Sequence, residues 1–556
     1  MRYGPVLTPD EVALVHFTVH GSQSGGHTGR TIVADDHRTV IFKPASPFTP
    51  GEQVTIGTSR LSTGPETIFG GLAYTFTVAT NQGAGSLGTT DVPSDVVKSA
   101  FPGFLTVPQD IPHFTVSGAI PDGEGDIFAA PFYWTKSTLG SYLLILNHLG
   151  QLVYYQPMAQ ALAAYDFKVQ PNGLLSYYDQ KDATYNLMDS HYRVVGQYRA
   201  GNGYTADLHD FQLLPNGNAL LMAYDAEMVD MSRVVAGGVP TATVTGLVVQ
   251  ELDPSQNVIL EWRSWDHFAY TDTTVSLTTP QIDLVHGNAL ALANDGNLLL
   301  SSRNLSEITK IDLQTGAVIW RLGGKSHTLQ LIGGQPFAFQ HDVRQLPNGD
   351  ITVFDNQGSA AAPAASMGLE YRVDAASGTA TRVWQFTHLP PVFATFMGDA
   401  QRLATGNTFI GWGAASTDKA FSYVSMTEVA PDGRVLFDLA FDPPFVSYRA
   451  FRFPWQGFPD TLPALAARVD ASGITLGYSW NGATEVSAYR VYGGSAPQAL
   501  KLIEVKPKTD FETQSHLAGL PPDECYFQVA ALDGDGRELA RSKVISTDSR
   551  CPLAAK

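Results

Sequence analysis

The chain has 556 residues and a formal net charge of −18. One hydrophobic core seldom organises so many residues, so the length predicts two to four domains. Nucleic-acid binding depends on clustered Lys and Arg, and an acidic chain is therefore not expected to bind nucleic acid. With 52 Gly, 34 Pro, 11% aromatic residues and few segments of helical period, the composition favours an all-β protein rich in turns.

The sequence contains few features that indicate a membrane span or export from the cell. No apolar run reaches the roughly 18 to 20 residues that span a bilayer as a helix, so no membrane span is expected. The start, Met1 to Pro5, lacks the basic and apolar regions of a signal peptide. The protein is then either cytosolic or an exported protein whose signal was replaced by an initiator Met. A possible disulfide between Cys525 and Cys551 and a glycosylation sequon at Asn304 favour a secreted or extracytoplasmic location.

Residues 1–112 are predicted to form an Ig-like β-sandwich followed by a linker. Short segments alternate apolar and polar residues, as half-buried strands do. The stretch from Phe42 to Glu52 resembles the strand-loop-strand of bacterial Ig-like modules. From Asn81 to about Pro112, Gly, Ser, Thr, Pro and Asp residues are typical of a linker. The strands of this domain are predicted at residues 13–19, 39–43, 53–57 and 73–78.

Residues 113–458 contain a repeated strand-turn-strand unit. Each copy has an apolar strand, a turn with Asp or Asn, and a second strand that often ends in an aromatic residue. Periods of roughly 40 to 60 residues with about four strands each are typical of a β-propeller. Six copies therefore predict six blades. The aromatic residues of the second strands are Tyr154, Tyr198, Trp262, Trp320, Trp384 and Phe437.

A second repeated segment places three histidines at equivalent positions. His341–Gly349 and His209–Gly217 are nearly identical, and a copy that is two residues longer begins at His286. The innermost strands of a propeller line a central channel, so the first residues of these segments should form a ring at one end of it. Aligned on the turn glycine where one exists, the six positions are Tyr165, His209, His286, His341, Gly398 and Tyr448.

Residues 459–556 are predicted to form a fibronectin type III-like β-sandwich, with an early Trp480 and a late Tyr-containing strand. That strand should pair across residues 533–536 with the strand that follows. Asp533 and Asp535 resemble the start of a calcium loop, but Val544 stands where the last acidic ligand would be. A hairpin turn is predicted there.

The three histidines allow several interpretations. Repeated His-Asp pairs can simply brace neighbouring strands through hydrogen bonds. Three imidazoles can also hold Zn or Fe, but Asp210 and Asp342 follow their histidines directly and should point the other way on a strand. A third interpretation adds Arg303 and Asn288, because a guanidinium beside imidazoles and an amide suits a tetrahedral oxyanion. Arg303 could instead pair with an acidic residue at the surface. The chain has neither a G-x-S-x-G nucleophile elbow nor an H-E-x-x-H zinc motif.

Five segments of residues 113–458 together carry a family resemblance. They are His209-Asp210, His286-Gly287-Asn288, Ser302-Arg303-Asn304, Ile319 to Lys325, and Gln340-His341-Asp342. In this order they resemble the arylsulfotransferases that do not use a nucleotide sulfate donor. The resemblance implies a six-bladed propeller, in agreement with the six repeats. The additional Ig-like and fibronectin-like modules are closer to a second branch of that family.

The resemblance implies a two-step transfer between small phenolic substrates, with no cofactor and no metal. His341 would attack the sulfur of an aryl sulfate, and a second phenol would take the sulfuryl group from the sulfohistidine. His209 or His286 could also protonate the leaving phenolate. The groups that match those holding the sulfuryl oxygens are His209, His286, Asn288 and Arg303. Aromatic residues that could stack on the aryl ring, unless they serve ordinary packing, are Tyr165, Tyr448, Phe393 and Phe396.

The chain departs from the pattern of the periplasmic members in two respects, of which the accessory modules are the first. The short disulfide near the active site of the periplasmic members has no counterpart, because residues 113–458 contain no cysteine. Two alternatives to sulfuryl transfer therefore stand. One is a lyase, isomerase or cyclase that uses the same histidines as acids and bases. The other is a binding or adhesion propeller, which the flanking modules suggest. The sequence names neither donor nor acceptor, and the oligomeric state is not predicted.

Overall fold

The structure is a computed structural model and describes residues 7–8, 15–33, 40–49, 51–59, 61–62, 68–69, 73–78, 101–118, 125–133, 140–159, 162–358, 362–443, 445–521 and 523–547. The described residues form antiparallel sheets and only short 3-10 helices, which confirms the all-β prediction. In this part of the chain no helix is long and apolar enough to cross a membrane. The chain divides into two compact units, one of residues 1–89, 198–351 and 370–383, the other of residues 90–197, 352–369 and 384–556.

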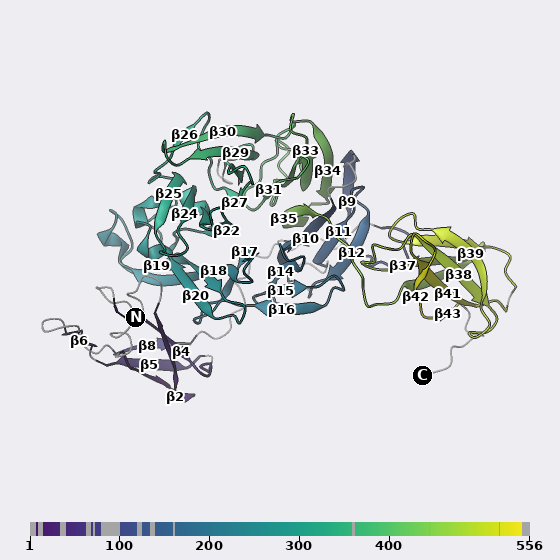
Figure 1. Cartoon of the computed structure of the whole chain (residues 1–556), viewed down its shortest axis with the longest axis horizontal. Coiled ribbons are helices and arrows are strands. Elements are labelled where there is room, and N and C mark those ends of the chain that lie inside the picture. Colours follow the sequence, from purple (N-terminus) through teal and green to yellow (C-terminus); the bar gives the residue numbers. More distant parts are fainter. Residues whose placement is uncertain are drawn as a thin grey trace. The chain divides into compact units, whose positions relative to one another are not determined.

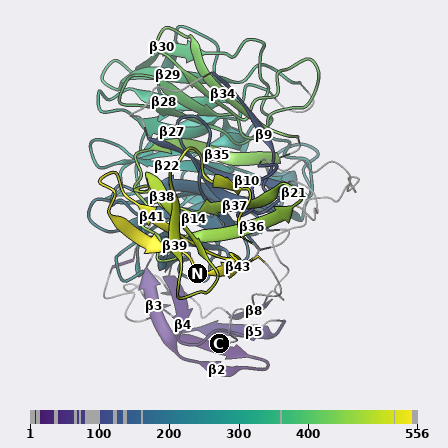
Figure 2. The same ribbon diagram turned by 90° about the vertical axis from the view of Figure 1, so that its right-hand side faces the viewer.

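The N-terminal strands of the first unit form one four-stranded sheet and two hairpins. The sheet has the order β2-β1-β5-β8, and its inner face buries Val19, Val54 and Ile56. Strands β3 and β4 lie side by side in purple (Figure 2). The strands predicted at 39–43, 53–57 and 73–78 are confirmed as β4, β5 and β8. The strand predicted at 13–19 overlaps β1 only from Phe17, and its first two residues lie outside the described residues. Strands β2, β3, β6 and β7 were not predicted. The elements are β1 (Phe17–Gly21), β2 (Gly25–His27), β3 (Gly29–Val33), β4 (Val40–Pro44), β5 (Gln53–Thr58), β6 (Leu61–Ser62), β7 (Ile68–Phe69) and β8 (Ala73–Thr77).

Two further sheets of the first unit carry His209 and His286. Each runs in chain order, β17-β18-β19-β20 and β22-β23-β24-β25, with the histidine segment at one edge (Figure 1). Fully buried Leu220, Val249 and Leu300 belong to one core between them. The strands are β17 (Ala206–Leu213), β18 (Ala219–Val229), β19 (Ala242–Leu252), β20 (Val258–Arg263), β21 (Gln281–Asp283), β22 (Gly287–Leu292), β23 (Leu298–Ser302), β24 (Glu307–Ile311) and β25 (Val318–Gly323). The 3-10 helices are η1 (Met231–Arg233), η2 (Ser264–Asp266), η3 (Tyr270–Asp272) and η4 (Arg303–Leu305).

Three sheets of the second unit also contain four or five strands each. Their orders are β12-β11-β10-β35, β13-β14-β15-β16 and β31-β32-β33-β34-β9, so strands more than 300 residues apart pair twice. The strands are β9 (Phe114–Gly118), β10 (Asp126–Tyr133), β11 (Tyr142–Leu146), β12 (Leu152–Pro157), β13 (Ala164–Val169), β14 (Leu175–Asp179), β15 (Thr184–Met188), β16 (Val194–Tyr198), β31 (Asp399–Arg402), β32 (Thr408–Gly411), β33 (Met426–Val429), β34 (Val435–Phe441) and β35 (Phe445–Phe453).

One more five-stranded sheet has the order β26-β30-β29-β28-β27, from β26 (Gln330–Ile332), β27 (His341–Gln345), β28 (Ile351–Asp355), β29 (Met367–Asp374) and β30 (Thr379–Phe386). The six predicted strand-turn-strand units are all confirmed as paired strands. They are β11-β12, β15-β16, β19-β20, β24-β25, β29-β30 and β33-β34.

The C-terminal residues of the second unit form two sheets, β36-β37-β40 and β39-β38-β41-β42, with β43 added to β41. The predicted hairpin is confirmed: the Asp533 side chain accepts the backbone N–H groups of Asp535 and Arg537. Cys525 is buried, and Cys551 lies outside the described residues. The strands are β36 (Ala464–Asp470), β37 (Gly473–Ser479), β38 (Ala488–Gly494), β39 (Lys501–Pro507), β40 (Thr513–Leu517), β41 (Tyr526–Leu532), β42 (Glu538–Arg541) and β43 (Ile545–Ser546).

The described end of the predicted linker is anchored to the C-terminal strands. The buried Glu512 carboxylate accepts the backbone N–H groups of Leu105 and Thr106 at 2.6 to 2.9 Å, and also the Thr106 hydroxyl. The prediction of a linker from Asn81 onwards falls mostly on residues 79–100, which lie outside the described residues.

Candidate functional site

The histidine segments end in turns of one conformation. Gly217 and Gly349 have φ of 85° and 90°, and each N–H donates to the carbonyl three residues earlier. Gly296, which ends the longer copy, has φ of 80° and makes the same bond. Glycine occupies this left-handed region without a steric cost, so the turn depends on it. The alignment of the copies on the turn glycine is therefore structurally sound.

The start of each histidine segment interrupts regular pairing. The register shifts between Ala206 and Phe211 where β17 pairs with β18, and between Gly287 and Ala289 where β22 pairs with β23. His286 and Asp342 have positive φ values of 51° and 54°. Such bulges and left-handed residues re-aim side chains and cluster near functional sites.

His209 and His286 lie against each other in the first unit. Their ring centroids are 4.9 Å apart, in an edge-to-face arrangement. The Nδ1 atom of each ring lies 2.6 Å from a carboxylate, Asp207 for His209 and Asp283 for His286. A carboxylate only accepts, so each Nδ1 donates its proton, and the lone pair of the neutral ring resides on Nε2. Neither carboxylate was predicted from the sequence, although they stand only two and three residues before their histidines.

His286 is held in its neutral form. Burial lowers its pKa below the usual value, and the positive charge that His209 and Arg303 can carry lowers the pKa further, while Asp283 opposes the shift. At neutral pH the ring is therefore an uncharged acceptor at Nε2.

Arg303 is placed beside His286 by the short helix η4. Its backbone N–H donates to the His286 carbonyl at 2.9 Å, and its guanidinium lies 5.1 Å from the centre of the Phe339 ring. Nη1 donates to Asn304, but Nε is buried and has no hydrogen-bond partner among the described residues. The alternative of a surface ion pair is therefore wrong within this part of the chain. A guanidinium with a buried donor to spare can bind an anion.

Asn304, the sequon residue, is buried, and its side-chain amide donates to the Asp283 carbonyl at 2.7 Å. Glycosylation requires an accessible Asn side chain. The sequon therefore gives no support to an extracytoplasmic location.

His341 is almost fully buried at the start of β27. Its Nδ1 donates to the Phe339 carbonyl at 3.1 Å, which again leaves the lone pair of the neutral ring on Nε2. The preceding residue, Gln340, donates its side-chain amide to the Glu307 carbonyl at 3.0 Å. The buried Asn288 amide donates to the Gln340 carbonyl at 2.8 Å. Asn288 thus holds the backbone that carries His341.

The structure brings His209, His286 and Arg303 together and ties Asn288 to the segment of His341. In this part of the chain, no group of three or more His, Cys, Asp or Glu side chains is arranged to hold a metal ion.

The four predicted aromatic contacts all lie in the second unit. The rings of Tyr165 and Tyr448 are 6.1 Å apart, and Tyr165 also packs 5.0 Å from Phe132. Burial raises the pKa of Tyr165 to about 12. Phe393 is buried against Phe421. Phe396 is half-buried, and its carbonyl accepts the N–H of Ala414. These contacts are those of ordinary packing, and stacking on an aryl ring stays a prediction.

Three ring positions of the second unit lie on neighbouring strands. Gly398 donates its N–H to the Tyr448 carbonyl at 3.1 Å. The next residue along β35, Arg449, bonds to Asp166 at 2.7 Å, and Asp166 follows Tyr165. The alignment that placed Tyr448 with Tyr165 and Gly398 is therefore consistent with the structure.

The structure thus places two carboxylate-bound imidazoles beside a guanidinium on an all-β scaffold, and this arrangement can bind an anion. Residues 123–449 match the family described as Arylsulfotransferase (ASST). The chain belongs to the arylsulfotransferase family, and this membership supports aryl sulfotransferase activity in general.

Other comparisons are weaker. No curated protein matches the chain. Among solved structures, a protein of unknown function from Bacteroides caccae is 15% identical, with a TM-score of 0.36, over 59% of this chain and 98% of its own. A virginiamycin B lyase from Staphylococcus aureus is 10% identical, with a TM-score of 0.31, over 66% of this chain and 96% of its own.

The low pKa of His286 predicts a pH-dependent stability. Below pH of about 6.5, the usual histidine pKa, the unfolded chain binds a proton that the folded chain does not. The free energy of unfolding should therefore fall as the pH drops through this value. His286→Gln removes the contribution, so the stability lost between pH 7.5 and 5.5 should be smaller than in the wild type. Urea unfolding midpoints at both pH values measure it, and an equal loss in both proteins would contradict the assignment.

Proposed function

We propose that this protein transfers a sulfuryl group from an aryl sulfate to a phenol through a sulfohistidine on His341, without a nucleotide sulfate donor. The observation that carries the proposal is the cluster of Arg303, His286 and His209, because it presents a spare guanidinium donor beside two oriented imidazoles. Family membership supports the same class of reaction.

In the first step the Nε2 lone pair of His341 forms a bond to sulfur, and the bond from sulfur to the aryl oxygen breaks. The phenolate leaves with that electron pair. The guanidinium of Arg303 would hold the sulfuryl oxygens as charge builds on them. Positioning and charge stabilisation dominate such transfers, as they do for phosphoryl groups.

In the second step a phenolic acceptor attacks the sulfur of the sulfohistidine. Its oxygen forms the new bond, the bond from sulfur to Nε2 breaks, and His341 recovers its lone pair. The proton of the acceptor must leave as its oxygen attacks. His286 is suited to take this proton because its low pKa keeps the ring neutral, and the ring then returns the proton to solvent.

We also propose a domain plan: an Ig-like domain with its linker at residues 1–112, a six-bladed propeller at 113–458 and a fibronectin type III-like domain at 459–556. Six sheets of four or five strands between β9 and β35, counted over the described residues, support the propeller. The paired sheets of the C-terminal strands support the last domain. We also propose that the protein is located outside the cytoplasm.

The test is p-nitrophenyl sulfate turnover with and without a second phenol. Sulfuryl transfer predicts p-nitrophenol release that depends on the acceptor, together with the sulfated acceptor as product. Release of p-nitrophenol at a rate that does not depend on the acceptor would indicate a sulfatase. The absence of release with a series of aryl sulfates, and of any thermal stabilisation by sulfate, would contradict the proposal. An acid-base enzyme or a binding protein would then be the better interpretation.

A further inference from the structure

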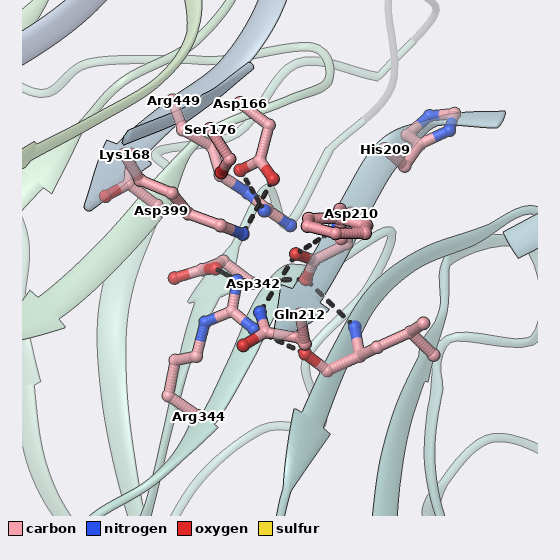
Figure 3. A network of polar contacts seen from close by, with 12 residues as sticks. Asp166, Lys168, Ser176, His209, Asp210, Gln212, Asp342, Arg344, Asp399 and Arg449 are labelled. Atoms are coloured by element: carbon pink, nitrogen blue, oxygen red, sulfur yellow. Dashed lines mark hydrogen bonds and ion pairs between the residues drawn. The ribbon is translucent and has the colours of Figure 1, made fainter. Parts of the chain in front are cut away.

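One guanidinium joins the three histidine segments, those of His209, His286 and His341. Arg344, in β27, donates Nη1 to the Leu290 carbonyl of β22 at 2.6 Å and Nη2 to the Asp210 carboxylate of β17 at 3.0 Å. The same Nη2 forms an ion pair with Asp342 at 2.7 Å. Asp210 also accepts the Leu290 N–H at 3.0 Å. Figure 3 shows this network around the labelled Arg344.

Each residue that Arg344 contacts is close in the sequence to a candidate catalytic histidine. Asp210 follows His209, Asp342 follows His341, and Leu290 is four residues after His286. In Figure 3 the side chains of His209 and Asp210 point in different directions, so the carboxylate is directed into the network rather than towards the ring. Asp210 is fully buried, and the Arg344 side chain keeps 22% of its exposure.

The three strands need such a link because they belong to three different sheets. No backbone ladder joins β17, β22 and β27 to one another, so side chains must set how the strands sit together. The backbone is also irregular at these points: β17 shifts register across Asp210, and Asp342 has a positive φ. An irregular backbone persists only where surrounding contacts hold it.

We propose that Arg344 is a positioning residue that sets the separation of His209, His286 and His341 without contacting the substrate. Its effect on turnover rests on the proposed function, whereas its effect on the imidazoles does not. Only a planar fork reaches a carbonyl and two carboxylates at once, so Lys cannot replace it fully.

The experiment compares Arg344→Gln and Arg344→Lys in the full chain. Because misplacing reacting groups by about 1 Å costs on the order of 100-fold, kcat for sulfuryl transfer should fall about 100-fold in Arg344→Gln and less in Arg344→Lys. KM for the donor should change less than about threefold, since Arg344 does not bind it. In protein with labelled histidines, the ring NMR signals of His209, His286 and His341 should shift, and that of His388 should not.

Arg452→Gln is the matched control. Arg452 is also a buried, ion-paired arginine, 2.6 Å from Glu428 in the second unit, so its loss should lower Tm as well. It should leave kcat within about threefold and the three histidine signals unchanged, because a structural loss alone does not misplace the reacting groups.

Two outcomes would overturn the proposal. A lower Tm in Arg344→Gln with unchanged kcat and unchanged histidine signals would make Arg344 a structural residue only. A raised KM with unchanged kcat would make it a binding residue. If the wild type transfers no sulfuryl group, the proposed function fails and the NMR comparison alone decides the role of Arg344. Arg344→Lys, which keeps the charge, serves the same comparison if Arg344→Gln does not fold.

Discussion

His341→Ala should abolish sulfuryl transfer, with a fall in kcat of at least about 1000-fold, because it removes the atom that bonds to sulfur. The Phe339 carbonyl holds the Nδ1 proton, so the reactive lone pair belongs to Nε2. Wild-type protein incubated with donor and no acceptor should gain one sulfuryl group on the peptide that contains His341. Steady-state kinetics and mass spectrometry of the quenched protein measure the two effects.

A matched control is His327→Ala, which removes an exposed histidine from the same unit. It should keep wild-type turnover and gain the same label. His341→Ala should bind the donor but remain unlabelled. Labelling at another histidine, or a kcat of His341→Ala above a tenth of the wild-type value, would show that His341 is not the nucleophile. The proposed sulfuryl transfer would then need a different covalent intermediate, whereas the geometry of the His209 and His286 pair would stand.

The parts of the fold that could be predicted from sequence were those with local physical causes. The turn after His341 requires a left-handed residue, so Gly349 marks its place. Alternation of apolar and polar residues marked strands such as β5, where Val54 and Ile56 face the core. The short β2 and β3 carry glycines and little alternation, so they gave no such signal.

Long-range contacts could not be predicted because no local pattern encodes them. Strand β35 pairs with β10, and no sequence pattern in either strand identifies the other as its partner. Within the candidate site, Asp283 reaches His286 over three residues, a spacing that strict strand alternation does not provide. Asp207 and His209 have the two-residue spacing of one strand face, but the register of β17 shifts there. Asp210 is a further example: the prediction that it turns away from its histidine fits Figure 3, but its partner Arg344, 134 residues later, could not be inferred.

Arg303→Met should lower kcat/KM for an aryl sulfate by about 100- to 1000-fold, the usual cost of removing a donor that stabilises transition-state charge. Arg303→Lys should recover only part of this loss, because an ammonium group cannot present a fork to two sulfuryl oxygens. Sulfate should raise the Tm of the wild type through binding to the folded state, and Arg303→Met should lose this shift. Arg372→Met, which removes an arginine with 66% of its side chain exposed, should change none of these quantities.

The stability of Arg303→Met separates a binding role from a structural one. Burial lowers the pKa of Arg303, which means that keeping the guanidinium charged there costs folding free energy. Among the described residues the guanidinium forms no direct ion pair, and the Asp283 carboxylate only partly offsets the effect of burial on its pKa. Its removal therefore breaks no direct ion pair. Without anion, the Tm of Arg303→Met should equal or exceed that of the wild type. A large loss of Tm would show that Arg303 serves the scaffold. Retained stability with lost activity would mean that its buried charge is kept for the anion that it binds.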